Sequence, residues 1–222
     1  MKLTERLAMV KLTLKKPFGE IRSIDLPCTL HIQGVTGAMF DELVDEDTKA
    51  ELIDGLMIVH SPTPLRHDAL AGVLRSLLRC YADEREAGSV FGPDCLFRLS
   101  SSRRLAPDAF FVERKRVPRR LPRQFEGAPD FVIEVLSPSN RQQDVEEKAP
   151  TYKQAGIKEI WVVDPDKRMV HVERLRGKNY SSTRITSGKL LSSAVKGFWI
   201  DAAWLWAEPL PSVMACLRQI LN

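Results

Sequence analysis

The chain has no long hydrophobic run. No stretch approaches the roughly 18 apolar residues that a membrane-spanning helix requires, and the residues that follow Met1 are of mixed charge rather than apolar. These absences argue against a membrane span and against a secretory leader. We therefore expect a soluble, intracellular protein of the cytoplasm, with no membrane partner.

Cysteine is scarce, and its spacing is uninformative. The four cysteines are Cys28, Cys80, Cys95 and Cys216, with no CxxC pair among them. The sequence therefore indicates neither a zinc knuckle nor a disulfide framework, and we expect reduced thiols. GxGxxG, Walker, nucleophile-elbow and HExxH signatures are also missing, which leaves nucleotide-dependent, serine-hydrolase and zincin chemistry without a basis.

An overall excess of one charge is lacking as well, since 33 Lys and Arg face 29 Asp and Glu for a formal net charge of +4. The exception is a basic stretch between residues 103 and 123. Its members are Arg103, Arg104, Arg114, Lys115, Arg116, Arg119, Arg120 and Arg123. Such a stretch is either a solvated surface or a surface that contacts phosphates.

Length and composition favour one domain. A chain of 222 residues with 44% hydrophobic residues can bury a sizeable core without disulfides or metals. Residues 1–36 show no strong helical period, and we interpret them as an N-terminal extension. We expect residues 37–222 to form a single domain.

Local patterns predict an α/β protein. Asp54-Gly55 between two apolar runs predicts a β-hairpin, and apolar residues at helical spacing from Leu70 to about Ala87 predict an amphipathic helix. Short apolar runs then predict strands around Val90-Phe91, Cys95–Leu99, Asp108–Val112, Phe131–Leu136, Ile160–Val163 and Val170–Glu173. The fold class that we expect is a mixed β-sheet flanked by α-helices.

The connections between the later strands are also predictable. A helix from about Asp144 to Ala155, ended by Gly156, joins two apolar strands and is typical of a βαβ-type crossover. Asp164-Pro165-Asp166 then predicts a turn into a hairpin.

A carboxylate lies in the middle of one apolar strand. Glu134 interrupts Phe131–Leu136, and Pro107-Asp108 opens an earlier apolar run. An ionised carboxylate in a dry strand costs several kcal/mol unless something compensates it, and a divalent cation shared with a second carboxylate does so. The sequence therefore indicates a metal site at the ends of two adjacent strands. The alternatives are an arginine partner for Glu134 and a turn or cap role for Asp108.

Several segments together carry a family resemblance. They are "AELIDGLMIVHSPTPLRHDAL", "LAPDAFFV", "GAPDFVIEVLSPSNRQQDVEEKAPTYKQAGIKEIWVVDP" and "GKLLSSAVKGFWID". In order and spacing they resemble the Uma-two family of restriction endonucleases, within the PD-(D/E)XK nuclease superfamily. The resemblance covers roughly residues 38 to 204 and implies a restriction-endonuclease-like fold.

The resemblance implies roles for four residues. Asp108 and Glu134 match the superfamily's acidic pair, which holds Mg²⁺ or Mn²⁺. The backbone carbonyl of Val135 is an expected further oxygen ligand. Glu51 in "ELIDG" matches a third acid, although a glutamate before an apolar strand is otherwise a solvated residue or a partner of a helix end.

The lysine of the superfamily motif is displaced. Leu136 stands two residues after Glu134, so the expected ammonium is missing there, and Lys148 is the best substitute. Pro150 either interrupts the helix or marks the first turn of a helix that starts later, which would leave Lys148 before it. The other interpretation of Lys148 is an exposed partner of Asp144.

The expected function is hydrolysis of phosphodiester bonds in nucleic acid, with DNA as the partner and Mg²⁺ or Mn²⁺ as the cofactor. Asp108, Glu134 and Lys148 are the candidate catalytic residues. The candidate nucleic-acid contacts are His67, Arg103, Arg104, Arg114, Arg116 and Arg119. His67 is alternatively a structural residue or a partner of a metal ligand, and His60 and His171 are assigned no role. The rival function is an inactive nuclease-fold module that binds nucleic acid or a protein. A second copy of the chain, in a homodimer, is a further candidate partner.

Overall fold

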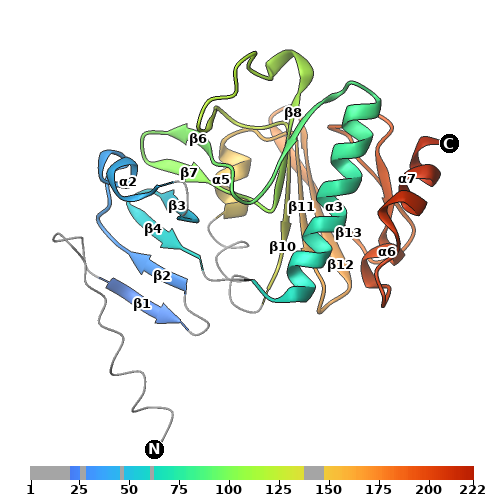
Figure 1. Ribbon diagram of the computed structural model, residues 1–222, viewed down its shortest axis with the longest axis horizontal. Helices are drawn as coiled ribbons and strands as arrows, with labels where there is room; N and C mark the ends of the chain where they lie inside the picture. The colour runs from blue at the N-terminus through green and yellow to red at the C-terminus, as the bar shows by residue number, and fades with distance from the viewer. Residues whose placement is uncertain (1–20, 26–28, 46–47, 61–62, 138–147) are drawn as a thin grey trace, which may run out of the picture.

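The computed structural model describes residues 21–25, 29–45, 48–60, 63–137 and 148–222 (Figure 1). Two mixed sheets lie side by side, and helices cover the faces of the second sheet. The prediction of a mixed α/β fold is confirmed.

The first sheet has seven strands in the order β1-β2-β4-β3-β7-β6-β9. These strands are β1 (Ile21–Asp25), β2 (Thr29–Ile32), β3 (Ala50–Ile53), β4 (Leu56–Val59), β6 (Phe97–Ser100), β7 (Arg103–Leu105) and β9 (Phe125–Glu126). Strands β3 and β4 form the predicted hairpin. Its turn residues Asp54 and Gly55 have φ of 47° and 90°, as a two-residue hairpin turn of this kind requires.

Part of the predicted N-terminal extension belongs to this sheet. Strands β1 and β2 pair with each other, and β2 pairs with β4. Residues 21–25 and 29–32, which we interpreted as part of the extension, therefore belong to the first sheet. The reason is that alternating stretches too short to be informative alone become strands when β4 offers an edge.

The second sheet has six strands in the order β13-β12-β11-β10-β8-β5. They are β5 (Gly88–Phe91), β8 (Ala109–Glu113), β10 (Phe131–Val135), β11 (Glu159–Asp164), β12 (Met169–Arg176) and β13 (Asn179–Ile185). Strands β10 and β11 are parallel, whereas β11 and β12 are antiparallel. The predicted crossover and the predicted hairpin are both confirmed. A separate two-stranded sheet pairs β14 (Lys189–Leu191) with β15 (Trp199–Asp201).

The helices of the described residues are mostly short. They are α2 (Gly37–Leu43), α3 (Leu65–Glu84), the 3₁₀ helix η1 (Arg114–Arg116), α5 (Ala149–Gln154), α6 (Ala202–Trp206) and α7 (Val213–Leu221). Helix α3 is the predicted amphipathic helix. Helix α5 begins at Ala149 with Pro150 in its first turn, and Gly156 follows it with φ of 74°. The predicted stretch from Asp144 to residue 147 lies outside the described residues.

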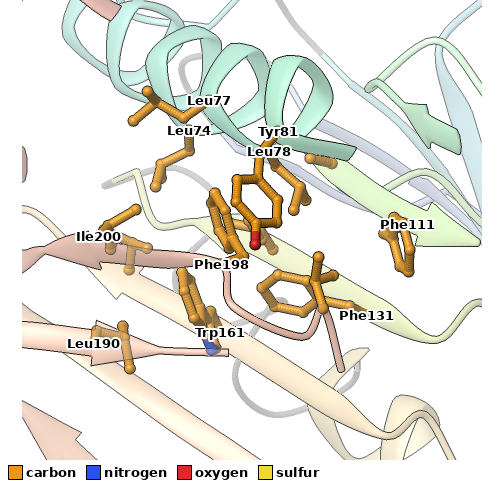
Figure 2. Packing of buried hydrophobic residues seen from close by; sticks show 14 of the residues in the cluster. Leu74, Leu77, Leu78, Tyr81, Phe111, Phe131, Trp161, Leu190, Phe198 and Ile200 are labelled. Atoms are coloured by element: carbon orange, nitrogen blue, oxygen red, sulfur yellow. The ribbon is translucent and has the colours of Figure 1, made fainter. Parts of the chain in front are cut away.

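Two hydrophobic clusters cover opposite faces of the second sheet. Toward α3, the cluster joins residues of that helix to the sheet and to the C-terminal segment; Figure 2 shows Tyr81, Phe131, Trp161 and Phe198 at its centre. On the other face, Val132 and Leu136 pack with Tyr152 of α5. Alternate residues of β10 therefore point to opposite faces, and Glu134 shares the α5 face with Val132 and Leu136.

Within the described part of the chain, no helix is both long enough and apolar enough to cross a membrane.

Candidate active site

The register of the second sheet brings the two predicted carboxylates together. Strands β8 and β10 are antiparallel, and Ile133 is opposite Ala109. Extending this register by one residue places Asp108 opposite Glu134. Residues directly opposite each other in such a pair have Cβ atoms about 4.5 to 5.5 Å apart. Both side chains are buried, with 7% and 2% of their residue surfaces exposed.

Asp108 is fixed by contacts from a neighbouring strand and from α3. Its Oδ2 accepts a hydrogen bond from the backbone N–H of Val135 at 2.8 Å, and the same oxygen lies 3.3 Å from Nε2 of His67. Burial acts to raise the pKa of the Asp108 carboxyl. The His67 imidazole and the Val135 N–H outweigh that effect, so the pKa lies below its ordinary value. Asp108 is therefore an ionised, oriented carboxylate.

His67 joins the carboxylate to the backbone of β10. Its Nε2 lies 2.7 Å from the carbonyl oxygen of Val135, so this nitrogen carries the proton and donates. Burial lowers the pKa of His67, but the Asp108 carboxylate and the Val135 carbonyl raise it to a net value above the ordinary one. The imidazole is buried, and its Nδ1 has no hydrogen-bond partner in the described chain. This geometry favours a role in orienting Asp108 and Val135 over a direct contact with phosphate.

Lys148 supplies an ammonium on the α5 face of the sheet. It is the N-cap residue of α5, and its Nζ lies 2.6 Å from Oε1 of Glu134. Only 2% of Lys148 is exposed, so it is not the exposed helix residue of the alternative interpretation. Leu136, at the usual lysine position, is buried with its apolar neighbours on the same face. The ammonium therefore reaches Glu134 from the helix instead of the strand.

Tyr152 completes the surroundings of Glu134. Its hydroxyl donates to Oε1 of Glu134 at 2.5 Å, and its ring is fully buried. Burial and the adjacent Glu134 charge raise the pKa of Tyr152 well above its ordinary value, so the hydroxyl stays protonated. The sequence reasoning missed this residue. The available signal was its position four residues after Lys148, because residues at that spacing on a helix lie on one face.

Glu51 reaches the same place from the first sheet. Its Oε1 accepts from the N–H of Ala106 at 2.8 Å and lies 3.2 Å from Nζ of Lys148. Its Oε2 lies 2.7 Å from Nε2 of His60, a residue that was assigned no role from the sequence. Burial acts to raise the pKa of Glu51, but Lys148, His60 and the Ala106 N–H lower it to about 2. Glu51 is thus a buried, ionised partner of Lys148.

The donor set fits a hard divalent cation. The described residues hold no group of three or more His, Cys, Asp or Glu side chains arranged to bind a metal ion. Magnesium does not need such a group, since it commonly takes one or two carboxylates and completes its shell with water and substrate phosphate. Asp108, Glu134 and the Val135 carbonyl offer such oxygens.

The predicted arginines have different surroundings. Arg104 is 1% exposed, and its guanidinium lies 2.8 Å from Oδ2 of Asp41. It therefore stabilises the contact between α2 and β7, and its predicted contact with nucleic acid does not fit this burial. Arg103 pairs with Asp54 at 2.6 Å. Arg119 is exposed.

Two other arginines of the basic stretch lie beside the second sheet. Arg116 lies 2.9 Å from the buried carboxylate of Asp130, and Arg114 lies 3.7 Å from Glu86. The basic stretch is thus partly neutralised by acids that lie outside it in the sequence.

The mixed sheets with their flanking helices match a nuclease-like fold. A solved structure with TM-score 0.68 is described as "a putative nuclease belonging to DUF820" from Anabaena variabilis. It is 21% identical, and the alignment covers 78% of this chain and 97% of that one. No curated protein matches the chain.

The family Uma2, described as "Putative restriction endonuclease", matches residues 38–203. The chain belongs to this family, and the resemblance seen in the sequence is confirmed.

Proposed function

We propose that the protein is a metal-dependent endonuclease that hydrolyses phosphodiester bonds in nucleic acid, with DNA as its substrate. One observation carries the proposal: in a chain of this family, the strand register and α5 bring Asp108, Glu134 and Lys148 to one buried place. Two carboxylates and an ammonium at that place are the groups that phosphodiester hydrolysis with a bound cation requires.

Asp108, Glu134 and the carbonyl of Val135 are the proposed holders of Mg²⁺ or Mn²⁺. Such an ion, when bound, acts as a Lewis acid on a phosphoryl oxygen and lowers the pKa of a bound water. His67 orients two of these ligands, because its Nε2 lies 2.7 Å from the Val135 carbonyl and 3.3 Å from Asp108. Glu51 becomes a third ligand only if the cation occupies the position that the Lys148 ammonium has beside Oε1 of Glu51.

Lys148 is the proposed electrostatic catalyst. Its ammonium lies beside a proposed metal ligand, where it can face the negative charge that develops on the phosphate during attack. Tyr152 donates to the same oxygen of Glu134 and so helps to fix the carboxylate. These contacts hold the catalytic groups in place before the substrate arrives, which lowers the cost of organising them.

The substrate backbone is proposed to lie along the exposed part of the basic stretch. Arg103, Arg114, Arg116 and Arg119 remain candidates for phosphate contacts. Contacts of this kind position a nucleic acid without reading its bases. Arg104 is left out because it is buried against Asp41.

The test is cleavage of supercoiled and single-stranded DNA by purified protein in Mg²⁺, Mn²⁺ or EDTA. We expect nicking that requires the metal and disappears in Asp108→Ala and Glu134→Ala. Glu173→Ala is the matched control, because this glutamate lies on β12 and pairs with Lys153 of α5. This variant should cleave as the wild type does.

A second candidate function is a non-catalytic module that binds nucleic acid. The observation that favours it is the direct ion pairing of Lys148 with both Glu134 and Glu51, because a buried cluster can be neutralised in this way without a cation. Absence of cleavage with either metal, with salt-sensitive DNA binding unchanged in Asp108→Ala and Glu134→Ala, would replace the nuclease by this module.

A further inference from the structure

We propose that His60 is a positioning residue for Lys148 and acts through Glu51. The proposal rests on the proposed function only for the catalytic use of Lys148; the contacts themselves belong to the fold. His60 directly follows β4, and Glu51 lies on the paired strand β3. The hairpin of the first sheet therefore presents a histidine and a carboxylate to a lysine that belongs to α5.

Because Lys148 does not lie on a strand, its side chain needs contacts that hold it in position. Lys148 is the N-cap residue of a six-residue helix, whereas a lysine at position 136 would be held by the sheet itself. Its side chain has a flexible four-carbon stem, and fixing such a stem costs up to about 2 kcal/mol in lost rotamer freedom. Glu134 alone offers an oxygen that a catalytic cation also uses. Glu51, 3.2 Å from Nζ, offers a second carboxylate from another element.

The position of Glu51 depends in turn on two donors. The Ala106 N–H holds Oε1 at 2.8 Å, and His60 faces Oε2 at 2.7 Å. With both oxygens held, the carboxylate plane is fixed, and Oε1 is directed at Lys148. Without His60, a fully buried Oε2 loses its donor, which favours rotation of the carboxylate toward another partner.

His60 is suited to this role because it is not itself within the buried cluster. Its side chain is 13% exposed, while that of Glu51 is 0% exposed. His60→Ala removes this hydrogen bond together with a side chain that is mostly buried, so a variant that keeps the donor is needed to separate the two effects. Glutamine is the conservative replacement, since its amide nitrogen can donate to Glu51 much as Nε2 does.

The experiment compares His60→Ala, His60→Gln and the control His171→Ala, in which the histidine lies on β12 of the second sheet. Two quantities are measured. The first is kcat and KM for metal-dependent DNA cleavage. The second is the ¹H–¹⁵N signal of the Lys148 ammonium, assigned by its loss in Lys148→Met. Thermal unfolding shows that each variant is folded.

For His60→Ala we expect kcat to fall about 10-fold to 100-fold with KM unchanged, as for loss of a partner of a site residue. We also expect the ammonium signal to broaden through faster exchange with water. His60→Gln should restore both quantities, and His171→Ala should change neither. A purely structural role for His60 would instead lower the unfolding temperature without a separate effect on the ammonium or rescue by glutamine.

The two proposals fail in different ways. Cleavage by the wild type combined with an unchanged ammonium signal in His60→Ala overturns the positioning role and leaves the nuclease. Absence of cleavage in the wild type, with the ammonium signal still broadened in His60→Ala and restored by glutamine, overturns the nuclease and supports the positioning of Lys148.

Discussion

The ammonium of Lys148 lies 2.6 Å from Oε1 of Glu134, although one residue begins a helix and the other lies within a central strand. The lysine thus reaches the carboxylate from the start of α5, whereas the superfamily motif has a lysine on the strand. It also ties α5 to β10, so any change of Lys148 acts on both stability and chemistry.

Lys148→Met should reduce the free energy of unfolding by about 3 to 5 kcal/mol, since removal of one partner leaves a buried charge uncompensated. Cleavage should also be lost. Lys153→Met is the matched control on the same helix, because its salt bridge with Glu173 is partly exposed and should cost less than about 1 kcal/mol. Urea unfolding measures both, and equal costs in the two variants would contradict the assignment of Lys148 to a buried cluster.

Tyr152→Phe should weaken metal binding about 10-fold to 100-fold, because the hydroxyl orients the proposed ligand Glu134. Calorimetric titration with Mn²⁺ measures this affinity without reference to cleavage. In the control Tyr180→Phe, the lost hydroxyl bonds the carbonyl of Ile157, so metal affinity should not change. Equal Mn²⁺ affinity in all three proteins would show that Tyr152 does not act on a metal ligand.

His67 should make stability depend on pH with a definite sign. Its pKa is raised above 6.5 in the folded protein, so the folded state holds its proton more tightly than the unfolded state. The stabilisation is complete below the unfolded pKa and is lost as pH rises through the higher folded pKa. Urea unfolding measures the free energy of unfolding of the wild type and of His67→Gln across about pH 5 to 9. The difference between the two free energies should shrink as pH rises.

His171 provides a control of opposite sign. Burial, aided by Arg184 and Lys167, lowers the pKa of His171, so its protonation favours the unfolded state. His171→Gln should therefore remove a destabilisation that grows as pH falls. If the effect on the free energy of unfolding changed with pH in the same direction for His67→Gln and His171→Gln, the opposite environments assigned to the two histidines would be refuted.

Arg119→Ala should weaken DNA binding and reduce the slope of log affinity against log salt by about 1, as expected for one phosphate contact of an exposed arginine. Arg104→Ala should leave that slope unchanged but lower the free energy of unfolding, since Arg104 is buried against Asp41. Binding measured over a range of salt concentrations distinguishes them, and an unchanged slope in Arg119→Ala would remove that residue from the nucleic-acid surface.

Local patterns were sufficient for much of the fold. The turn at Asp54-Gly55 is encoded by residues that accept positive φ. Helix α3 is encoded by the helical spacing of its apolar residues. Strands β1, β2 and β13 were not predicted, because short or polar strands gain stability from a neighbouring edge rather than from their own sequence. The same limit applies to Arg104, whose burial depends on where α2 packs.

The sequence by itself determined that Glu134 would need compensation, since a carboxylate among apolar strand residues cannot stay charged and alone. It also carried the resemblance that identifies the family, and it predicted that Asp108 and Glu134 act together. Tertiary structure alone decided which groups surround that charge: Lys148, Tyr152 and, through Glu51, His60. Those contacts join two sheets and a helix, and side-chain distances between elements remote in the chain are fixed only when those elements pack together.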